Sequence, residues 1–448
     1  MRPLLLVLAA VLVVAGCATP PAQAAPWPER PSVDLSYDLA PDLRGAAGRE
    51  SVTFTPDRRI CELVFRTWPN APSPASEGNA LRVTDASVDG RAAAPSVRAG
   101  GTLVELPLPS CVDAGTPVRA ELGFAVRLGA DADERLGTSA GTAWFGSAFP
   151  MLAWVRGRGW VRDDPVRIPG ETAVSEEFRL DALRVTAPDG AAVSGVGRAE
   201  GTAPGARPGT TTHTFRADGM RDVAVAVGAY RVLERDLAGG TRLHLVTPVA
   251  GTRVAPERWA DEVDGALGRL EELLGPMPQR DLWVAIAPSQ SSGIEFTGAL
   301  QFGDTAPGEL PELVAHELAH QWFYGLVGND QGRDPWLDEA FTTYAQARVT
   351  GTGGSYEVDP ARDDLGLSMA AWAERGFGPY NTGVYDQGAA VLLAARERAG
   401  HDAFDDALRA YLAANAHGVA TPDDVARAFA GLPAVTDALR RAGALPPT

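Results

Sequence analysis

Two histidines four positions apart, His316 and His320, are the residues whose type and spacing most clearly indicate chemistry. On an α-helix, positions i and i+4 share one face about 6 Å apart along the axis, so two imidazoles can bind one zinc ion. Glu317 follows the first histidine and can reach a metal-bound water without binding the metal. The chain holds only six histidines in 448 residues, so chance is a poor explanation for this pattern. We therefore predict a metal site here.

A third ligand is predicted at Glu339, on the next predicted helix. The intervening loop, 325–335, allows that helix to return beside the first. Two histidines and one carboxylate leave the fourth zinc position open for water, which is the catalytic rather than the structural arrangement. We expect one Zn²⁺ per chain, although the same donors also bind other divalent metals. Zinc would activate the water, and Glu317 would carry its proton to a leaving amine.

The region 316–339 resembles the zinc signature of the aminopeptidase N family, also called membrane alanyl aminopeptidases, which are gluzincins with a thermolysin-like catalytic domain. Segment 336–341, WLDEAF, is similar to the family's WLNEGFA. Segment 292–296, SGIEF, looks like its GxMEN, which implies that Glu295, with Gly293 beside it, binds the substrate and that Glu295 holds its free amine. Segment 384–388, VYDQG, resembles Y-x-K-G and implies that Tyr385 stabilises the transition state.

The sequence departs from the family pattern at several points. Phe296 replaces the family asparagine and Ser292 replaces the first glycine. No counterpart is evident for the glutamine or glutamate by which the family's N-terminal domain helps to grip the amine. The resemblance covers 240–430 well, covers 32–237 only in outline, and implies a short form without the family's large C-terminal helical domain.

These residues predict a zinc-dependent metallopeptidase that acts as an aminopeptidase. Two alternatives stay open: an endopeptidase or dipeptidyl peptidase on the same zinc site, and an inactive peptide-binding lipoprotein with a peptidase fold. The complete set of ligands, Glu317 and Tyr385 argues against the inactive protein. Asp338 is interpreted as a residue behind the ligands or on the surface, and Tyr380 as a residue that could line the pocket. The remaining histidines have no ligand-like spacing: His213, His244, His401 and His417.

The elements that must position this site change in type along the chain, which predicts an α+β multidomain protein. Residues 32–237 contain short strand-like runs separated by turn signals, as expected of an antiparallel, β-sandwich-like domain. Its tryptophans are expected in the core; they are Trp144, Trp154 and Trp160. Residues 238–448 are expected to form the mainly helical, thermolysin-like zinc peptidase domain. Helices are predicted at 256–274, 309–326, 335–350, 382–399, 403–415 and 422–430, and strands at 281–287 and 299–303.

The start of the chain resembles an export signal. Residues 1–16 form a signal peptide whose apolar run is too short to span a bilayer. Small residues precede Cys17, as in a bacterial lipobox, so Cys17 is predicted to be lipidated; an A-x-A site at 22–24 is the competing signal and would release a soluble protein. Residues 17–31 are rich in Ala and Pro and are interpreted as a tether. We expect an exported protein, anchored by lipid on the outer face of a bacterial cell membrane or otherwise secreted.

Composition limits the partners. The formal net charge of −17 argues against nucleic-acid binding and against adsorption to anionic lipid by charge, so membrane contact is expected through the lipid anchor only. Peptides are the expected substrates, and nothing in the sequence indicates an oligomeric state. Cys61 and Cys111 are the two remaining cysteines, and in an exported chain they suggest one disulfide.

Overall fold

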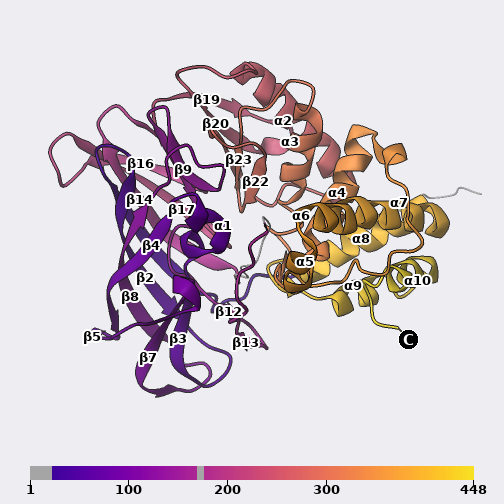
Figure 1. The fold of residues 1–448 in the computed structure, drawn as a ribbon, viewed down its shortest axis with the longest axis horizontal. Coiled ribbons are helices and arrows are strands. Elements are labelled where there is room, and N and C mark those ends of the chain that lie inside the picture. Colours follow the sequence, from indigo (N-terminus) through magenta and orange to yellow (C-terminus); the bar gives the residue numbers. More distant parts are fainter. Residues whose placement is uncertain (1–22, 169–175, 448) are drawn as a thin grey trace, which may run out of the picture.

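The computed structural model describes residues 23–168 and 176–447. The chain forms a β-rich half, a small mixed sheet and a helical half, which follow one another in sequence (Figure 1). This is the predicted α+β multidomain architecture. The predicted signal peptide, 1–16, and Cys17 lie outside the described residues.

The β-rich half is built on one large sheet. Its order is β16 (Arg198–Pro204), β17 (Thr210–Met220), β14 (Phe178–Pro188), β1 (Ser32–Leu39), β2 (Gly45–Phe54), β8 (Val118–Arg127), β4 (Ala80–Val88) and β5 (Arg91–Ala92). All neighbours are antiparallel except β1 and β14. Buried and more exposed residues alternate along β1 and β2, as they must when one face of a sheet covers the core.

Two smaller sheets share the core of the large one. The first has the order β15 (Ala192–Ser194), β18 (Ala224–Gly228), β10 (Thr142–Gly146) and β9 (Leu136–Ser139); the second has the order β11 (Met151–Leu152), β3 (Ile60–Arg66), β7 (Leu103–Val112) and β6 (Ser96–Arg98). A ribbon of β12 (Trp154–Val155) and β13 (Gly159–Trp160) lies beside them. Trp144 and Trp154 are buried as expected, whereas Trp160 is only half-buried.

A five-stranded sheet opens the second half, in the order β19 (Tyr230–Asp236), β20 (Arg242–Pro248), β21 (Asp281–Ile286), β23 (Ala299–Phe302) and β22 (Gly293–Phe296). The central pairs, β20–β21 and β21–β23, are parallel, and both edge strands are antiparallel. The predicted division at residue 237 falls between β19 and β20, which pair with each other in this sheet. The local pattern of a strand does not reveal its partner.

The helices lie mostly where periodicity predicted them. They are α2 (Pro256–Leu274), α3 (Leu310–Ala319), α4 (Trp336–Thr350), α5 (Met369–Arg375), α6 (Phe377–Tyr380), α7 (Gln387–Ala399), α8 (His401–Asn415), α9 (Pro422–Ala428) and α10 (Pro433–Arg441), with a π-helical segment at Asn381–Asp386. A further short helix, α1 (Pro72–Ser76), lies in the β-rich half and was not predicted. Helix α3 ends earlier than predicted. After His320 the chain turns tightly, since a Cβ on Gly325 would come within 2.8 Å of the Gln321 carbonyl oxygen. Helices α5, α6 and α10 were not predicted.

No helix among the described residues is both long and apolar enough to cross a membrane.

The described part of the predicted tether, 23–31, packs against the folded protein. The Ala24 amide donates to the Ala413 carbonyl of α8 at 2.8 Å. The Arg30 guanidinium donates to the Asp218 carbonyl of β17 at 2.8 and 3.0 Å. The Trp27 ring lies 3.8 Å from the guanidinium carbon of Arg156. The backbone and side chains of this described part of the predicted tether therefore have specific partners in both halves.

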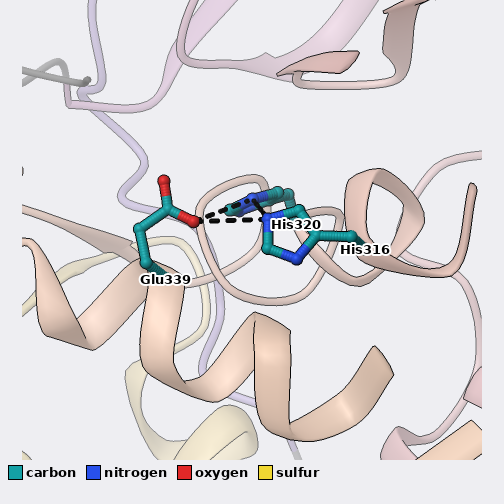
Figure 2. Close-up of side chains that lie close together, drawn as sticks. All are labelled: His316, His320 and Glu339. Carbon is teal, nitrogen blue, oxygen red and sulfur yellow. Dashed lines mark hydrogen bonds and ion pairs between the residues drawn. The ribbon is translucent and has the colours of Figure 1, made fainter. Parts of the chain in front are cut away.

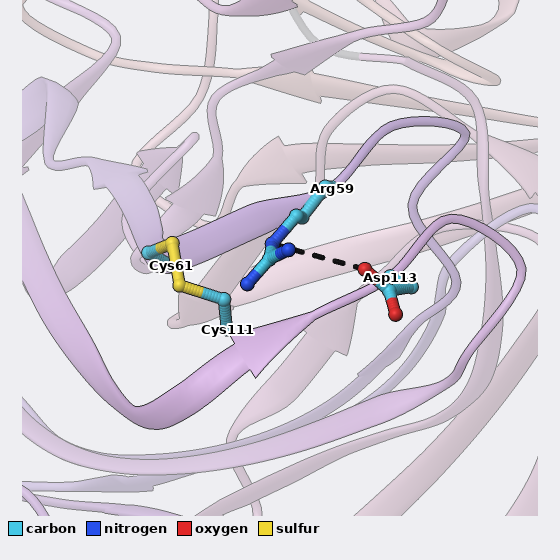
Figure 3. Close-up of a disulfide and its surroundings, with 4 residues drawn as sticks. All are labelled: Arg59, Cys61, Cys111 and Asp113. Carbon is cyan, nitrogen blue, oxygen red and sulfur yellow. Dashed lines mark ion pairs between the residues drawn. A yellow bond between two sulfur atoms is a disulfide. The ribbon is translucent and has the colours of Figure 1, made fainter.

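The expected disulfide joins Cys61 of β3 to Cys111 of β7 (Figure 3). These strands are antiparallel neighbours, and their register shifts between Ile60 and Glu62, where Cys61 lies. An ion pair between Arg59 and Asp113, 3.7 Å apart, flanks the bridge. Both cysteines are exposed, so the bridge acts mainly by cross-linking the chain rather than by packing.

We predict that the Cys61→Ser/Cys111→Ser variant unfolds at lower temperature, with the free energy of unfolding of the β-rich half reduced by about 2–4 kcal/mol. The bridge closes a loop across a sequence separation of 50 residues. Without the bridge, the unfolded chain gains conformational entropy. Calorimetry of the variant checks this, and reduced wild-type protein should behave like the variant. An unchanged transition would contradict the prediction.

Candidate active site

Three ligand atoms converge at one point between α3 and α4 (Figure 2). The Nε2 atoms of His316 and His320 are 3.4 Å apart. The Oε2 atom of Glu339 lies 3.4 Å from the first and 3.5 Å from the second. Three corners of a zinc tetrahedron with bonds of about 2.0–2.1 Å are about 3.3–3.4 Å apart, so the triangle has the size that zinc requires.

The hydrogen bonds around this triangle also fit a metal ion. The outer Nδ1 of His316 contacts Gln346 Oε1 at 3.0 Å, and that of His320 contacts Asp338 Oδ1 at 2.6 Å. If each Nδ1 carries the proton, each Nε2 presents a lone pair to the centre. Glu339 Oε2 is buried without a hydrogen-bond donor among the described residues. Three acceptors thus face one point, and a cation satisfies all of them.

The charges around His320 favour a positive ion at this point. Burial lowers the pKa of His320, but the carboxylates of Glu295, Asp338 and Glu339 outweigh burial and raise this pKa well above its usual value. A second group of possible ligands is formed by Glu295, His320 and Asp338, within 4.8 Å of one another. The Nδ1 of His320 already bonds Asp338, so that group holds the ring in place and the first triangle is the better candidate for a metal site.

Asp338 thus lies behind the ligands, one of the two placements that the sequence allowed. Its Oδ2 accepts a hydrogen bond from Gln331 Nε2 at 2.8 Å, and the side chain is 1% exposed. Gln331 and Gln346 were not identified from the sequence. No spacing rule connects them to the ligands. Gln346 contacts His316, and Gln331 contacts Asp338 behind His320, only because α3, α4 and the loop before α4 pack together.

Glu317 points into the same cleft from α3. Its side chain is 4% exposed, and its Oε2 has no hydrogen-bond partner among the described residues. Burial raises the pKa of Glu317 to about 8, and the imidazoles of His316 and His320 oppose that rise. A carboxyl group with a pKa near neutrality can both take and return a proton.

Gly293, on edge strand β22, lies directly against Glu317. A Cβ at position 293 would be 2.4 Å from Glu317 Cγ and 2.5 Å from its carboxyl carbon. The glycine is therefore needed for space, because any side chain there would push the carboxyl group out of position. The sequence indicated Gly293 only through the family resemblance and as a substrate-binding residue.

We predict that Gly293→Ala lowers kcat of this site strongly, by about a hundredfold, because a displacement of about 1 Å is enough to slow chemistry by that factor. Metal content should not change, since the ligands come from other elements. Gly308→Ala is the matched control, because a Cβ there meets no atom within 4 Å. Equal rates in the two variants would show that Glu317 tolerates the displacement.

Glu295 and Phe296 follow Gly293 and face opposite ways. Glu295 lines the cleft together with the three ligands and Glu317. Phe296 is fully buried toward the β-rich half, where its ring fills the space that a Cβ on Gly146 would need, 2.1 Å away. The departure from the family asparagine therefore leaves Glu295 in the cleft.

Tyr385 lies at the mouth of the same cleft, in the π-helical segment. Its ring stacks on His316, with centroids 5.7 Å apart and planes at 15°. The buried Tyr380 stands perpendicular to it at 5.6 Å. Burial, followed by the nearby Glu339 carboxylate, raises the pKa of Tyr385 well above its usual value. Tyr385 thus remains a neutral hydrogen-bond donor beside the metal ligands. The wider π turn is a feature that occurs often at functional sites.

The β-rich half closes the other side of the cleft, which has a volume of about 370 Å³. Its contribution comes from Trp68 in a 3-10 helical turn, from Pro74 in the short helix α1 and from the loop 133–135. None of these residues was identified from the sequence as part of the site. Their elements are distant in sequence from the zinc helix, so only the packing of the two halves brings them together.

A buried hydrogen bond joins the two halves beside the site. The Tyr324 hydroxyl, just after the zinc helix, donates to Asp222 at the end of the loop following β17. The other oxygen of Asp222 accepts from the Thr297 amide at 3.1 Å, directly after β22. Tyr324 has a φ of 135°, which is strained for a residue with a side chain. This network holds the end of the strand that carries Glu295.

Sequence comparison agrees with this geometry. The family model described as "Peptidase family M1 domain" matches residues 304–373, which include the three candidate ligands and Glu317. This match supports an aminopeptidase N-like gluzincin family for the part of the chain that holds the candidate zinc site. The predicted resemblance to the aminopeptidase N-like gluzincins is thereby confirmed.

Relatives with known names include aminopeptidase M1-A of Oryza sativa subsp. japonica, 32% identical over 27% of this chain and 15% of its own length. Aminopeptidase B of Mus musculus is 30% identical over 29% of this chain and 20% of its own length. The chain therefore spans only a small part of these relatives. Among solved structures, the M1 zinc metallopeptidase from Deinococcus radiodurans is similar over 93% of this chain and 94% of its own, with a TM-score of 0.66 and 20% identity. A mutant of that enzyme bound to a Tyr-Ser-Ala substrate aligns with a TM-score of 0.68. At this identity the likeness shows the fold.

Proposed function

We propose that this protein is a zinc-dependent aminopeptidase that removes N-terminal residues from peptides. The observation that carries the proposal is the meeting of three kinds of group in one cleft: the ligand triangle, the base Glu317 and the carboxylate Glu295. The names of the relatives and the peptide bound to the Deinococcus radiodurans mutant support the same activity. We propose one zinc ion per chain, because the two groups of possible ligands among the described residues share His320, whose Nδ1 is already bonded to Asp338.

Each residue then has a defined task. Zinc, when bound, lowers the pKa of water to about 7 and polarises the scissile carbonyl. Glu317 takes a proton from the attacking water and passes it to the leaving amine. Tyr385 donates a hydrogen bond to the oxygen that becomes negative as the carbonyl carbon turns tetrahedral. Glu295 pairs with the free α-ammonium of the substrate.

The position of Glu295 favours an aminopeptidase over the endopeptidase and dipeptidyl peptidase alternatives. Its side chain is 7% exposed and lies in the cleft beside His320. A substrate ammonium would neutralise this buried carboxylate, whereas a chain continuing past it would leave the charge without a partner in a water-poor site. The inactive-lipoprotein alternative is disfavoured because the ligands, the base and Tyr385 are all in place.

Export and lipid attachment at Cys17, with release as a soluble protein as the alternative, are proposed from the sequence signals alone. Membrane contact would then run through the lipid only. No oligomeric state is proposed.

We predict about one zinc ion per purified chain. His320→Ala should lose both zinc and activity, because one corner of the triangle is removed. Glu317→Gln should keep the zinc and lose about 10²–10⁴-fold in kcat, because the amide cannot accept the proton. Metal analysis and peptidase assays on the same preparations check both variants. Full zinc occupancy in His320→Ala would place the metal elsewhere.

We predict that Glu295→Ala lowers kcat/KM for unblocked aminoacyl substrates by about a hundredfold or more, since an ammonium without its partner costs a few kcal/mol and 1.4 kcal/mol is about one decade. Zinc content should be unchanged, and N-acetylated peptides should be poor substrates of the wild-type protein. Glu272→Ala, an exposed carboxylate on α2, serves as the control. If blocked and unblocked peptides are cut equally well and Glu295→Ala changes neither rate, the endopeptidase alternative replaces this proposal.

A further inference from the structure

Gln290 is a buried primary amide in the wall of the cleft, on the loop between β21 and β22. Its side chain is 5% exposed. Neither Oε1 nor Nε2 has a hydrogen-bond partner among the described residues. The amide offers two donors and an acceptor oxygen, and leaving a buried polar group without partners is unfavourable. The family motifs that identified Glu295 and Tyr385 do not include this position.

The loop holds Gln290 in place, so the buried amide is imposed by its surroundings. Ser289 Oγ donates to the Ala132 carbonyl at 2.8 Å. The amide and hydroxyl of Ser291 donate to the two oxygens of Asp133 at 2.8 and 2.6 Å. Gln290 is therefore pinned on both sides against the β-rich half.

The backbone of Gln290 is held from behind as well. Its amide donates to the Ala287 carbonyl at 3.2 Å. A Cβ on Gly303 would lie 1.9 Å from the Gln290 carbonyl oxygen, so β23 approaches the loop as closely as a glycine allows. The backbone at Gln290 therefore has no room to move away from the cleft, and the side-chain amide lies buried in the cleft wall.

The position of Gln290 indicates which part of a substrate meets it. In the proposed function, Glu295 holds the α-ammonium and the ligand triangle lies at the first peptide bond. The first side chain leaves the carbon between these two groups. Gln290 lines the cleft together with Trp68, Pro74 and Glu134 of the β-rich half. A long first side chain that extends toward these residues would come within reach of the amide.

We propose that Gln290 hydrogen-bonds the side chain of the substrate's N-terminal residue and selects long, neutral, hydrogen-bonding side chains such as glutamine over apolar ones of similar length such as methionine. This inference rests on the proposed aminopeptidase function and assigns its side-chain preference. A glutamine side chain supplies both a carbonyl acceptor and amide donors, so it can pair with both ends of the Gln290 amide. A methionine side chain would bury that amide unpaired, and sites built to hydrogen-bond a substrate discriminate strongly for this reason.

The test compares kcat/KM for L-glutaminyl and L-methionyl arylamides. Wild-type protein should prefer the glutaminyl substrate by about tenfold or more, and Gln290→Met should reduce this ratio about tenfold. Gln279→Met makes the same chemical change outside the cleft, where Gln279 contacts Gly219, and should keep the wild-type ratio. Zinc content is measured for each protein.

A second variant keeps the test interpretable if Gln290→Met does not fold. Gln290→Glu keeps the size and the acceptors but replaces the donors by a negative charge, so it should shift preference from glutaminyl toward arginyl arylamide. Ratios unchanged in both variants, with zinc present and alanyl arylamide hydrolysed by the wild-type protein, would overturn this subsite while leaving the aminopeptidase function intact. A wild-type protein that cleaves no unblocked aminoacyl arylamide would overturn both.

Discussion

The convergence of three acceptor atoms on one buried point is the constraint on which the rest of the structure depends. The fold holds the ligand atoms of His316, His320 and Glu339 at separations of 3.4–3.5 Å. The packing of α4 against its neighbours fixes the position of Glu339. A Cβ on Gly388 of α7 would lie 2.3 Å from Ala340 Cβ, so these helices touch at backbone distance at the residue next to Glu339. The hydrogen bonds of Asp338 and Gln346 then fix the orientation of each imidazole.

The β-rich half is part of the site rather than an appended module. Its loop 131–135 forms one wall of the cleft and anchors the loop of Gln290 through Ala132 and Asp133. Its Asp222 binds both the turn after the zinc helix and the end of β22. Separating the halves would expose the metal ligands and release the strand that carries Glu295. Substrate recognition and metal binding therefore depend on the same interface.

The sequence predicted the parts of this site that are set by local geometry. His316, Glu317 and His320 follow from the helical repeat, and Glu339 from a helix that returns after a short loop. Family resemblance added Glu295 and Tyr385. The sequence could not predict contacts formed between distant elements, such as Gln290 with the β-rich half or Gln346 with His316. The partner of β19 could not be predicted for the same reason, because its sequence has the pattern of a strand whichever sheet it joins. The π-helical segment at Tyr385 was predicted as ordinary helix, since the extra residue in its turn leaves no clear pattern.

One short strand links the chemistry of the site to its specificity. In β22, Gly293 leaves room for the base Glu317, and Glu295, two positions later, faces the same cleft. Residues two apart in a strand lie on one face about 6.6–6.8 Å apart, so β22 fixes the separation between the glycine that makes room for the base and the carboxylate of Glu295. Because β22 is an edge strand paired only with β23, its register rests on that one ladder and on the Thr297–Asp222 hydrogen bond. A change that shifts β22 along β23 should therefore affect both carboxyl groups, since Gly293 makes room for Glu317 and β22 itself carries Glu295.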